Sequence, residues 1–238
     1  MTDRPILFSG PMVRAILDGR KTQDRRVAKI TAIMGNKVAI TNPDERLIEL
    51  EPGEFRTGIF HYESIGALSG PYRTGYAVGD RLWVRERFMP APDEPAPATP
   101  KPTRWNIAYA AGGQEFAMAP ADYNPMLYNY ERWSPSVFMP RWASRLTLLV
   151  TDVRVQRLHE ISNREALAEG IAPMPSGRFH CGHDEEGEVT AKSPVTAYAW
   201  LWNSLNGWRG FGWEANPWVV AITFDVRRCN IDQMDEAA

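Results

Sequence analysis

The chain has 238 residues, of which 44% are hydrophobic and 24% are charged, and its formal net charge at pH 7 is −2. A chain of this size buries enough apolar surface to fold as one domain without disulfides or a structural metal. The near-neutral charge excludes a generally basic nucleic-acid coat, the 2 cysteines exclude a disulfide scaffold, and no apolar run approaches the roughly 20 residues of a membrane-spanning helix.

Turn signals near the start of the chain predict a short helix followed by an extended segment. Pro11 suits the first helical turn, the apolar residues after it recur at helical spacing, and Gly19 supplies a C-terminal stop, so we expect a helix over residues 11–18. Residues 21–26 then leave this helix along an irregular or extended path. In residues 80–88, Leu82, Val84 and Glu86 alternate with Trp83, Arg85 and Arg87. This two-residue period predicts a strand with one charged face.

The second half of the chain alternates strands with two further helices. Residues 145–158 are rich in β-formers and predict a long or bent strand. Ser162 opens a capping-box pattern, which predicts a short helix that ends at Gly170. Residues 194–206 predict a helix, and residues 218–226 predict an apolar strand. Several strands, three short helices and no regular βαβ alternation favour an α+β fold, namely a small β-barrel with short helices packed over its ends.

Two segments interrupt this pattern and are interpreted as loop insertions. Residues 90–102 contain six prolines, which remove backbone donors and predict a loop or a stiff spacer. Residues 172–193 are rich in Gly, Ser, Pro and acidic residues. We therefore expect a single domain over residues 1–229 with insertions at about 89–104 and at 172–193, and a flexible tail over residues 230–238.

The second insertion contains residue types that can bind zinc, but their spacing does not match a zinc site. His180, Cys181 and His183 are followed by acidic residues. Their spacing does not fit the common zinc fingers, and no second cluster completes the set. The sequence therefore predicts no metal and no cofactor, and we interpret the stretch as an acidic loop with incidental histidines.

Positive charge is concentrated directly after the first predicted helix. Five cations and one anion, Asp24, lie between Arg20 and Lys29. Arginine side chains match phosphates in a bidentate manner, and a lysine flanked by cations can lose its proton and act as a base or nucleophile. The alternative is that Lys21 and the arginines form surface ion pairs with Asp24, Glu86 or Glu165, as charge runs usually do.

This run, GRKTQDRR, resembles the GxKxxExR pattern of the ASCH (activating-signal-cointegrator homology) domain, a branch of the PUA-like superfamily. Gly19, Lys21 and Arg26 match the pattern, and Asp24 stands at the acidic position as the shorter homologue. The resemblance continues, in order, over residues 5–23, 78–86, 138–158, 161–171, 201–207 and 216–224. These segments are together similar to a longer ASCH form found in phages and prophages, and they cover about a third of the chain.

The resemblance implies a β-barrel whose cleft, lined by this turn, accepts a nucleotide or RNA. Some small bacterial members of the superfamily remove the acetyl group of N4-acetylcytidine, using a lysine of this motif, a threonine three residues later and a glutamate on the following helix. Lys21 matches the lysine and Glu169 matches the glutamate, but Asp24 occupies the place of the threonine. Lys21 or Asp24 would then activate water directly; alternatively, Asp24 would keep Lys21 charged, which favours phosphate binding.

Aromatic residues add a second group of candidates. The chain has 9 tryptophans, and most are expected in the core. Trp83, beside Arg85, and Trp142 are the two expected to stack a base. Residues expected to be core are Trp200, Leu201, Trp213 and Trp218.

The leading interpretation is a protein that binds RNA or a modified nucleoside, located in the cytoplasm (of the host cell, if phage-encoded) and with no membrane partner. Lys21 and Arg26 would contact phosphate or base, and Gly19, Arg20 and Thr22 would line the same turn. A basic turn of this kind gives affinity through phosphate contacts, which by themselves carry no sequence preference.

Two other interpretations stay open. One is a hydrolase acting on N4-acetylcytidine or RNA, with Lys21, Asp24 and Glu169 as catalytic residues. The other is a phage accessory protein that binds a host protein and depends on the proline-rich segment. Replacing Lys21 by arginine separates binding from lysine-dependent catalysis, because arginine keeps its proton.

Overall fold

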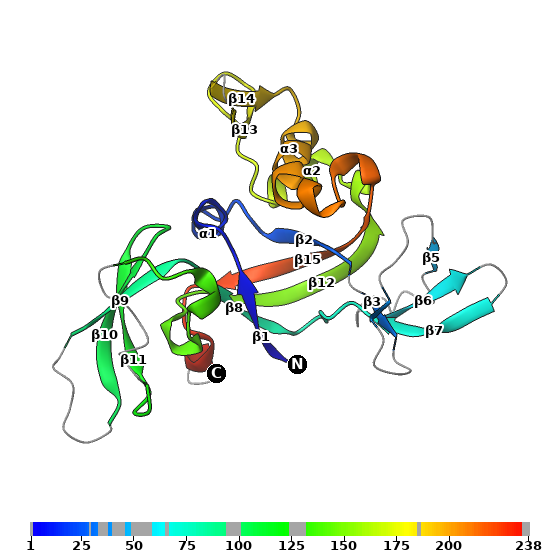
Figure 1. The fold of residues 1–238 in the computed structure, drawn as a ribbon. Coiled ribbons are helices and arrows are strands. Elements are labelled where there is room, and N and C mark those ends of the chain that lie inside the picture. The colour runs from blue at the N-terminus through cyan, green and yellow to red at the C-terminus, as the bar shows by residue number, and fades with distance from the viewer. Residues whose placement is uncertain are drawn as a thin grey trace. The chain divides into compact units, whose positions relative to one another are not determined.

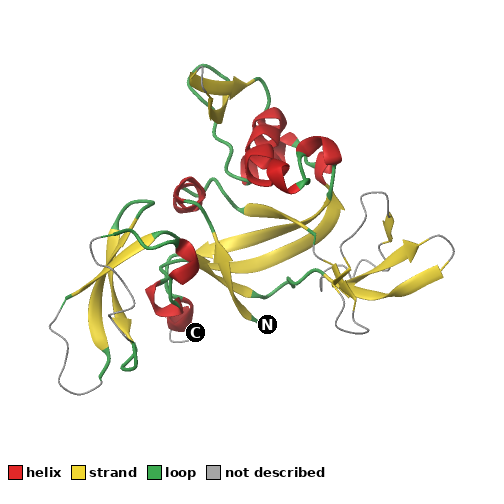
Figure 2. Ribbon diagram, viewed as in Figure 1, coloured by secondary structure: helices red, strands yellow, loops and turns green. Residues whose placement is uncertain are grey.

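The structure is a computed structural model that describes most of the chain, and it shows a mixed α+β protein. Strands predominate in the described part, and its three α-helices are short (Figure 2). No helix in that part is both long and apolar enough to cross a membrane. The described residues are 2–28, 30–32, 38–39, 46–48, 59–64, 67–93, 101–123, 132–184 and 187–234.

The chain forms two compact units, and each is discontinuous in sequence. The first unit contains residues 1–19, 80–149 and 225–238, and the second unit contains residues 20–79 and 150–224. The expectation of one domain with two insertions stays a prediction.

In the first unit, the N-terminal strand pairs with a strand far along the chain. β1 (Asp3–Leu7) runs parallel to β8 (Arg81–Arg85), which confirms the strand expected there. Helix α1 (Gly10–Leu17) follows β1 and confirms the first predicted helix. Gly19, with φ of 73°, terminates this segment in a left-handed conformation that glycine adopts without strain.

A three-stranded antiparallel sheet follows β8 in the first unit. It contains β9 (Phe88–Pro92), β10 (Thr103–Tyr109) and β11 (Gln114–Ala119), in the order β11-β10-β9. The expected proline-rich loop therefore begins as an edge strand, since an edge strand tolerates residues that lack a backbone donor. Residues 94–100, on which the host-protein interpretation depends, lie outside the described residues. The buried side chains of this region are Phe88, Trp105, Ile107, Tyr109, Ala119, Met139 and Ala143.

The C-terminal segment forms a short turn within the first unit. Ile231–Met234 is a 3-10 turn, and Ile231 is buried. Asp232 pairs with Arg141 at 2.6 Å, and Arg141 also pairs with Asp3. The expectation of a flexible tail over residues 230–238 stays a prediction.

The main strands of the second unit carry the candidate site. β12 (Thr147–Arg157) is the predicted long strand, and β15 (Trp218–Arg227) is the predicted C-terminal strand. β2 (Gln23–Val27) confirms the extended path after α1, and it pairs antiparallel with β15. The sheet order is β1-β8-β12-β15-β2, and β12 and β15 are each divided between the two units.

The expected β-barrel is not observed. The strands that the structure describes form open sheets, and the five-stranded sheet that begins at β1 ends at β2 without returning to its first strand. Closure requires a consistent tilt and stagger around all strands, which the alternation of residues within one strand does not encode. The α+β class is confirmed, and the PUA-like assignment stays a prediction.

Two helices of the second unit pack together (Figure 1). Helix α2 (Asn163–Ala168) begins with the predicted capping box, in which Ser162 Oγ accepts from the Glu165 backbone and the Glu165 carboxylate accepts from the Ser162 backbone. Helix α3 (Pro194–Asn206) has the predicted bounds.

The residues between these helices form a hairpin rather than the expected acidic loop. β13 (Phe179–Asp184) and β14 (Gly187–Ala191) pair antiparallel. Ala191 is buried in the core of the second unit, and Phe179 and Cys181 pack against that core. Burial of these apolar side chains favours a fixed hairpin over a solvated loop.

A further sheet of the second unit matches no element expected from the sequence. Its strand order is β4-β3-β7-β6-β5. The strands are β3 (Ile30–Ala32), β4 (Val38–Ala39), β5 (Arg46–Ile48), β6 (Ile59–Ser64) and β7 (Ala67–Arg73).

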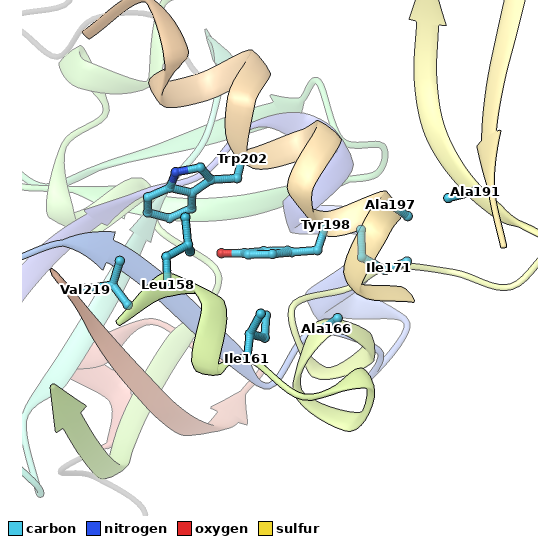
Figure 3. Close-up of a cluster of buried hydrophobic side chains, with 9 residues drawn as sticks. All are labelled: Leu158, Ile161, Ala166, Ile171, Ala191, Ala197, Tyr198, Trp202 and Val219. Atoms are coloured by element: carbon cyan, nitrogen blue, oxygen red, sulfur yellow. The ribbon is translucent and has the colours of Figure 1, made fainter. Parts of the chain in front are cut away.

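The core of the second unit lies between α2, α3 and the strands (Figure 3). Figure 3 shows Tyr198 pointing from α3 toward Leu158. Trp202 is also buried, whereas Trp200 is 41% exposed, so the expectation that Trp200 belongs to the core is wrong. The cluster consists of Leu158, Ile161, Ala166, Ile171, Ala191, Ala197, Tyr198, Trp202 and Val219.

Candidate functional site

The segment before β2 lies along the C-terminal end of α2. The Thr22 backbone N–H donates to the Ala168 carbonyl at 2.8 Å, and Lys21 and Glu169 form an isolated antiparallel bridge. Arg20 Nη1 donates to the Gly170 carbonyl at 2.8 Å. These main-chain contacts bring the Lys21 turn and Glu169 together within the second unit.

The Lys21 ammonium is enclosed by oxygen atoms. The residue is 1% exposed. Its Nζ lies 2.8 Å from Glu169 Oε2 and 3.0 Å from Asp24 Oδ1, and it donates to the Gln23 carbonyl at 2.7 Å. The three ammonium protons therefore have three short acceptors, and Glu169 O lies slightly farther away at 3.3 Å.

Further charges continue from both carboxylates. Asp24 Oδ2 lies 2.9 Å from Arg26 Nε, and the Arg26 side chain is 35% exposed. Glu169 Oε1 accepts from Arg25 Nη1 at 2.9 Å. Arg25 Nη2 lies 3.0 Å from Glu165 Oε1, which is an ion-pair distance without hydrogen-bond alignment.

These contacts form one chain of alternating charges, here called the charge network. Arg154 Nη2 completes it by donating to Glu165 Oε1 at 2.8 Å. The seven residues of the network comprise four cations and three anions, and Asp152, 3.0 Å from Arg154 Nε, adds a fourth anion at the surface. The two most exposed of the seven are Arg26, at 35%, and Arg154, at 36%. In order along the chain of contacts, its members are Arg154, Glu165, Arg25, Glu169, Lys21, Asp24 and Arg26.

The two carboxylates keep Lys21 protonated. Burial acts to lower the pKa of Lys21, but the charges of Asp24 and Glu169 outweigh it and raise this pKa above its ordinary value. Burial acts to raise the pKa of Asp24, but the charges of Lys21 and Arg26 outweigh it and lower this pKa. The pair is therefore an ammonium and a carboxylate at neutral pH.

Helix α2 and its C-cap residue together present two acidic side chains to β2, Glu165 from the helix and Glu169 from the C-cap. Glu165 and Glu169 are four residues apart, which places them on one face of a helix, one turn from each other. On β2, the two-residue alternation places Gln23 and Arg25 on one face and Asp24 and Arg26 on the other. Arg25 can therefore reach α2, while Arg26 stays closer to solvent.

Most candidate residues of the turn meet in this network. Lys21, Asp24, Arg26 and Glu169 are in direct contact. The ion pairs with Asp24 and Glu165 that the sequence also allowed are present, but they are buried rather than at the surface.

The flanking candidates contribute mainly through the main chain or lie at the surface. Thr22 donates through its backbone to Ala168 and accepts from the Phe224 backbone. Arg20 is exposed, and Gly19 ends the segment before the network.

The aromatic candidates belong to the first unit. The Arg85 guanidinium lies over the Trp83 ring at 4.6 Å. Trp142 packs against Tyr123 and Trp105, with ring centroids 4.9 Å and 6.3 Å away. Stacking of a base on Trp83 or Trp142 stays a prediction.

Arg25, Glu165 and Arg154 are the network residues that were not among the functional candidates expected from the sequence. Glu86, the third acid considered as a partner for the basic run, pairs instead with Arg145 in the first unit. The four-residue spacing of Glu165 and Glu169, together with the two-residue spacing of Gln23 and Arg25, is the signal from which a contact between α2 and β2 could have been predicted.

No metal site is found in the part of the chain that the structure describes. No group of three or more His, Cys, Asp or Glu residues there can hold a metal ion. Cys181 and Cys229 are free thiols.

Acid is expected to destabilise the protein through the carboxylates of the network. Burial acts to raise the pKa of Glu165, but hydrogen bonds from Ser162 and the charges of Arg154 and Arg25 lower it to about 2. A carboxyl group with a lowered folded-state pKa stabilises the protein above its unfolded pKa of roughly 4.3, and this contribution is lost as the pH falls toward the folded value.

Urea unfolding at pH 6 and pH 3 measures this contribution. Glu165→Gln keeps the size and capping ability of the side chain but removes its charge. We expect the wild type to lose more stability than Glu165→Gln between the two pH values. Equal losses would contradict a charged role for Glu165.

Comparison with models of known protein families, with curated proteins and with solved structures finds no match for this chain.

Proposed function

We propose that the chain is an ASCH-type protein that binds RNA or a modified nucleoside at the charge network. The observation that carries this proposal is the state of Lys21, whose ammonium is buried between Asp24 and Glu169 with a raised pKa. A general base must first lose its proton, so a lysine held in this way is a poor base at neutral pH. The network therefore favours binding over catalysis by lysine.

The cost of the network supports a functional role. Each buried ion costs several kcal/mol of desolvation, and apolar side chains of similar size often stabilise a protein as well or better. Clusters of buried titratable groups with shifted pKa values occur preferentially at functional sites. Asp152 lies 3.0 Å from Arg154 and balances the fourth cation, so an anionic ligand would be attracted by the exposed arginines of the network rather than by a net positive charge.

The ligand contacts are assigned to the accessible cations. Arg26 is 35% exposed at one end of the network, and Arg20 is exposed beside it in sequence. Both can contact phosphate in a bidentate manner. Lys21 is 1% exposed, so its role is to hold Asp24 and Glu169 in place rather than to contact phosphate itself. Asp24 retains lone pairs that can accept a hydrogen bond from a base edge.

The salt dependence of RNA binding tests this assignment. We expect the affinity for a short single-stranded RNA to fall as the salt concentration rises. A plot of the logarithm of the binding constant against the logarithm of the salt concentration should be linear, with a slope of about −0.7 for each phosphate contact. Arg20→Gln and Arg26→Gln should each reduce that slope by about 0.7. Arg164→Gln is the matched control, since it removes the same charge from an exposed position on α2.

Absence of RNA binding by the wild type, or slopes that do not change in Arg20→Gln and Arg26→Gln, would overturn the assignment. Equal effects in all three variants would indicate non-specific attraction to net charge instead.

A hydrolase is the second candidate, and the 2.8 Å contact between Lys21 Nζ and Glu169 Oε2 favours it. Because Lys21 is protonated, the chemical roles differ from those expected of a basic lysine. Asp24 or Glu169 would take a proton from water, the water oxygen would attack the acyl carbon, and the Lys21 ammonium would stabilise the oxyanion. Collapse of this intermediate would break the bond between the acyl carbon and N4, and the carboxyl group would return its proton to N4, which releases cytidine and acetate.

Incubation with N4-acetylcytidine, followed by chromatographic detection of cytidine, tests this candidate. Cytidine release that is lost in Asp24→Asn, which keeps the size but not the charge, would favour the hydrolase. If the protein neither releases cytidine nor binds RNA, both candidate functions are excluded.

A further inference from the structure

Arg25 lies between the two acidic side chains of α2. It belongs to β2, and its side chain is 0% exposed. Its Nη1 donates to Glu169 Oε1 at 2.9 Å and also to Gln23 Oε1 at 3.2 Å, while Nη2 lies 3.0 Å from Glu165 Oε1. These three contacts of Arg25 are all made with protein side chains.

Glu169 is shared between two cations. Its Oε1 faces Arg25 and its Oε2 faces Lys21. A carboxylate with a cation on each oxygen has one favoured orientation, whereas a carboxylate with one cation can rotate about its terminal bond. Arg25 thus determines whether Oε2 points at the Lys21 ammonium.

Glu165 and Glu169 would otherwise repel each other. Like charges four residues apart destabilise a helix, and here both carboxylates face the interior side of α2. The planar guanidinium reaches both of them with separate nitrogen atoms, which a lysine ammonium cannot do in the same geometry.

We infer that Arg25 is a positioning residue: it clamps Glu165 and Glu169 of α2 and thereby orients Glu169 onto Lys21. The consequence for ligand binding rests on the proposed function, but the orientation of Glu169 and Lys21 is a property of the ligand-free protein. The two can therefore be tested separately.

The first test measures the Lys21 ammonium in the ligand-free protein. The chain has five lysines, so a lysine-labelled sample gives a simple ¹H–¹⁵N correlation spectrum of ammonium groups. We expect the Lys21 ammonium protons to exchange with water at least about tenfold faster in Arg25→Lys, because a carboxylate partner of the ammonium is no longer fixed. The backbone amide spectrum verifies that the variant is folded.

Arg154→Met is the matched control for this test. Arg154 also pairs with Glu165, at 2.8 Å, but its ion pairs in the described part of the chain are with Glu165 and Asp152 and not with Glu169. We expect exchange of the Lys21 protons in Arg154→Met to stay within about twofold of the wild type. Equal exchange in wild type and Arg25→Lys, or equal acceleration in both variants, would overturn the inference.

A milder variant covers the case in which Arg25→Lys does not fold. Glu165→Gln leaves Arg25 in place and keeps the capping box, but it removes one of the two charges that the guanidinium spans. We expect it to accelerate the same exchange by a smaller factor. An unchanged rate would count against the clamp.

The second test separates positioning from phosphate contact. Arg25→Lys should weaken RNA binding at least about tenfold without changing the slope of affinity against salt, because the number of phosphate contacts is unchanged. A decrease in slope by about 0.7 would make Arg25 a phosphate ligand and overturn the positioning role. A wild type that binds no RNA would refute the proposed function, while the ammonium exchange would still decide on Arg25.

Discussion

Replacing Arg145 by methionine is expected to lower the free energy of unfolding by about 3–5 kcal/mol. In the first unit, Arg145 forms a bidentate pair with Glu86, with Nε 2.9 Å from Oε1 and Nη2 3.0 Å from Oε2. Arg145 also donates to the Gly112 carbonyl and lies over the Tyr109 ring at 3.9 Å. Its removal leaves the Glu86 carboxylate, which is 1% exposed, without its cation.

The pH dependence of this loss identifies its cause. Burial raises the pKa of Glu86 above its ordinary value, and Arg145 partly offsets that rise. A carboxyl group with a raised folded-state pKa binds a proton more readily in the folded state, so lowering the pH should recover part of the stability lost in Arg145→Met.

Urea unfolding at pH 8 and pH 5 measures both effects. Arg104→Met is the control, because the Arg104–Asp93 pair is 3.6 Å long with side chains 49% and 34% exposed. Such a pair contributes no more than about 1 kcal/mol. Equal losses in the two variants, or a loss in Arg145→Met that does not depend on pH, would contradict the argument.

Replacing Glu169 by glutamine is expected to produce the second large effect, a loss of about 3–5 kcal/mol. The amide keeps the size of the side chain but removes the anion that faces Lys21 at 2.8 Å and Arg25 at 2.9 Å. Two buried cations then share fewer anions, which is more costly than the loss of one hydrogen bond.

A double-mutant cycle with Lys21→Met tests the coupling. We expect the variant with both changes to lose less stability than the sum of the single variants, because the second change removes a charge that the first left unpaired. Glu160→Gln, at an exposed glutamate, is the control and should change stability by less than about 1 kcal/mol. Additive effects of Lys21→Met and Glu169→Gln would show that the two residues do not stabilise each other.

Local signals in the sequence predicted the elements that carry the site. The capping box at Ser162, the apolar spacing of α3 and the alternation of β8 each depend on neighbouring residues only, and all are confirmed. The face of α3 was harder to assign, because Trp200 and Trp202 have similar hydrophobicity and only the packing of Tyr198 and Trp202 decides which is buried.

Pairing between distant strands could not be predicted in the same way. β1 pairs with β8 through the contact of Leu7 with Arg85, and the hairpin of β13 and β14 is held by the core of the second unit. The expectation of a closed barrel was wrong for the same reason, since closure depends on strand edges that no single segment specifies.

The sequence by itself determined that Lys21, Asp24 and Arg26 lie within one short turn and that Glu169 ends a capped helix. Only the tertiary structure decided that these charges are buried, that Lys21 is held as an ammonium, and that Arg25 rather than a residue of the recognised motif spans the two glutamates of α2. The physical reason is that burial and ion pairing depend on contacts between residues nearly 150 positions apart, such as Lys21 and Glu169, and their energies change with the surroundings those contacts create.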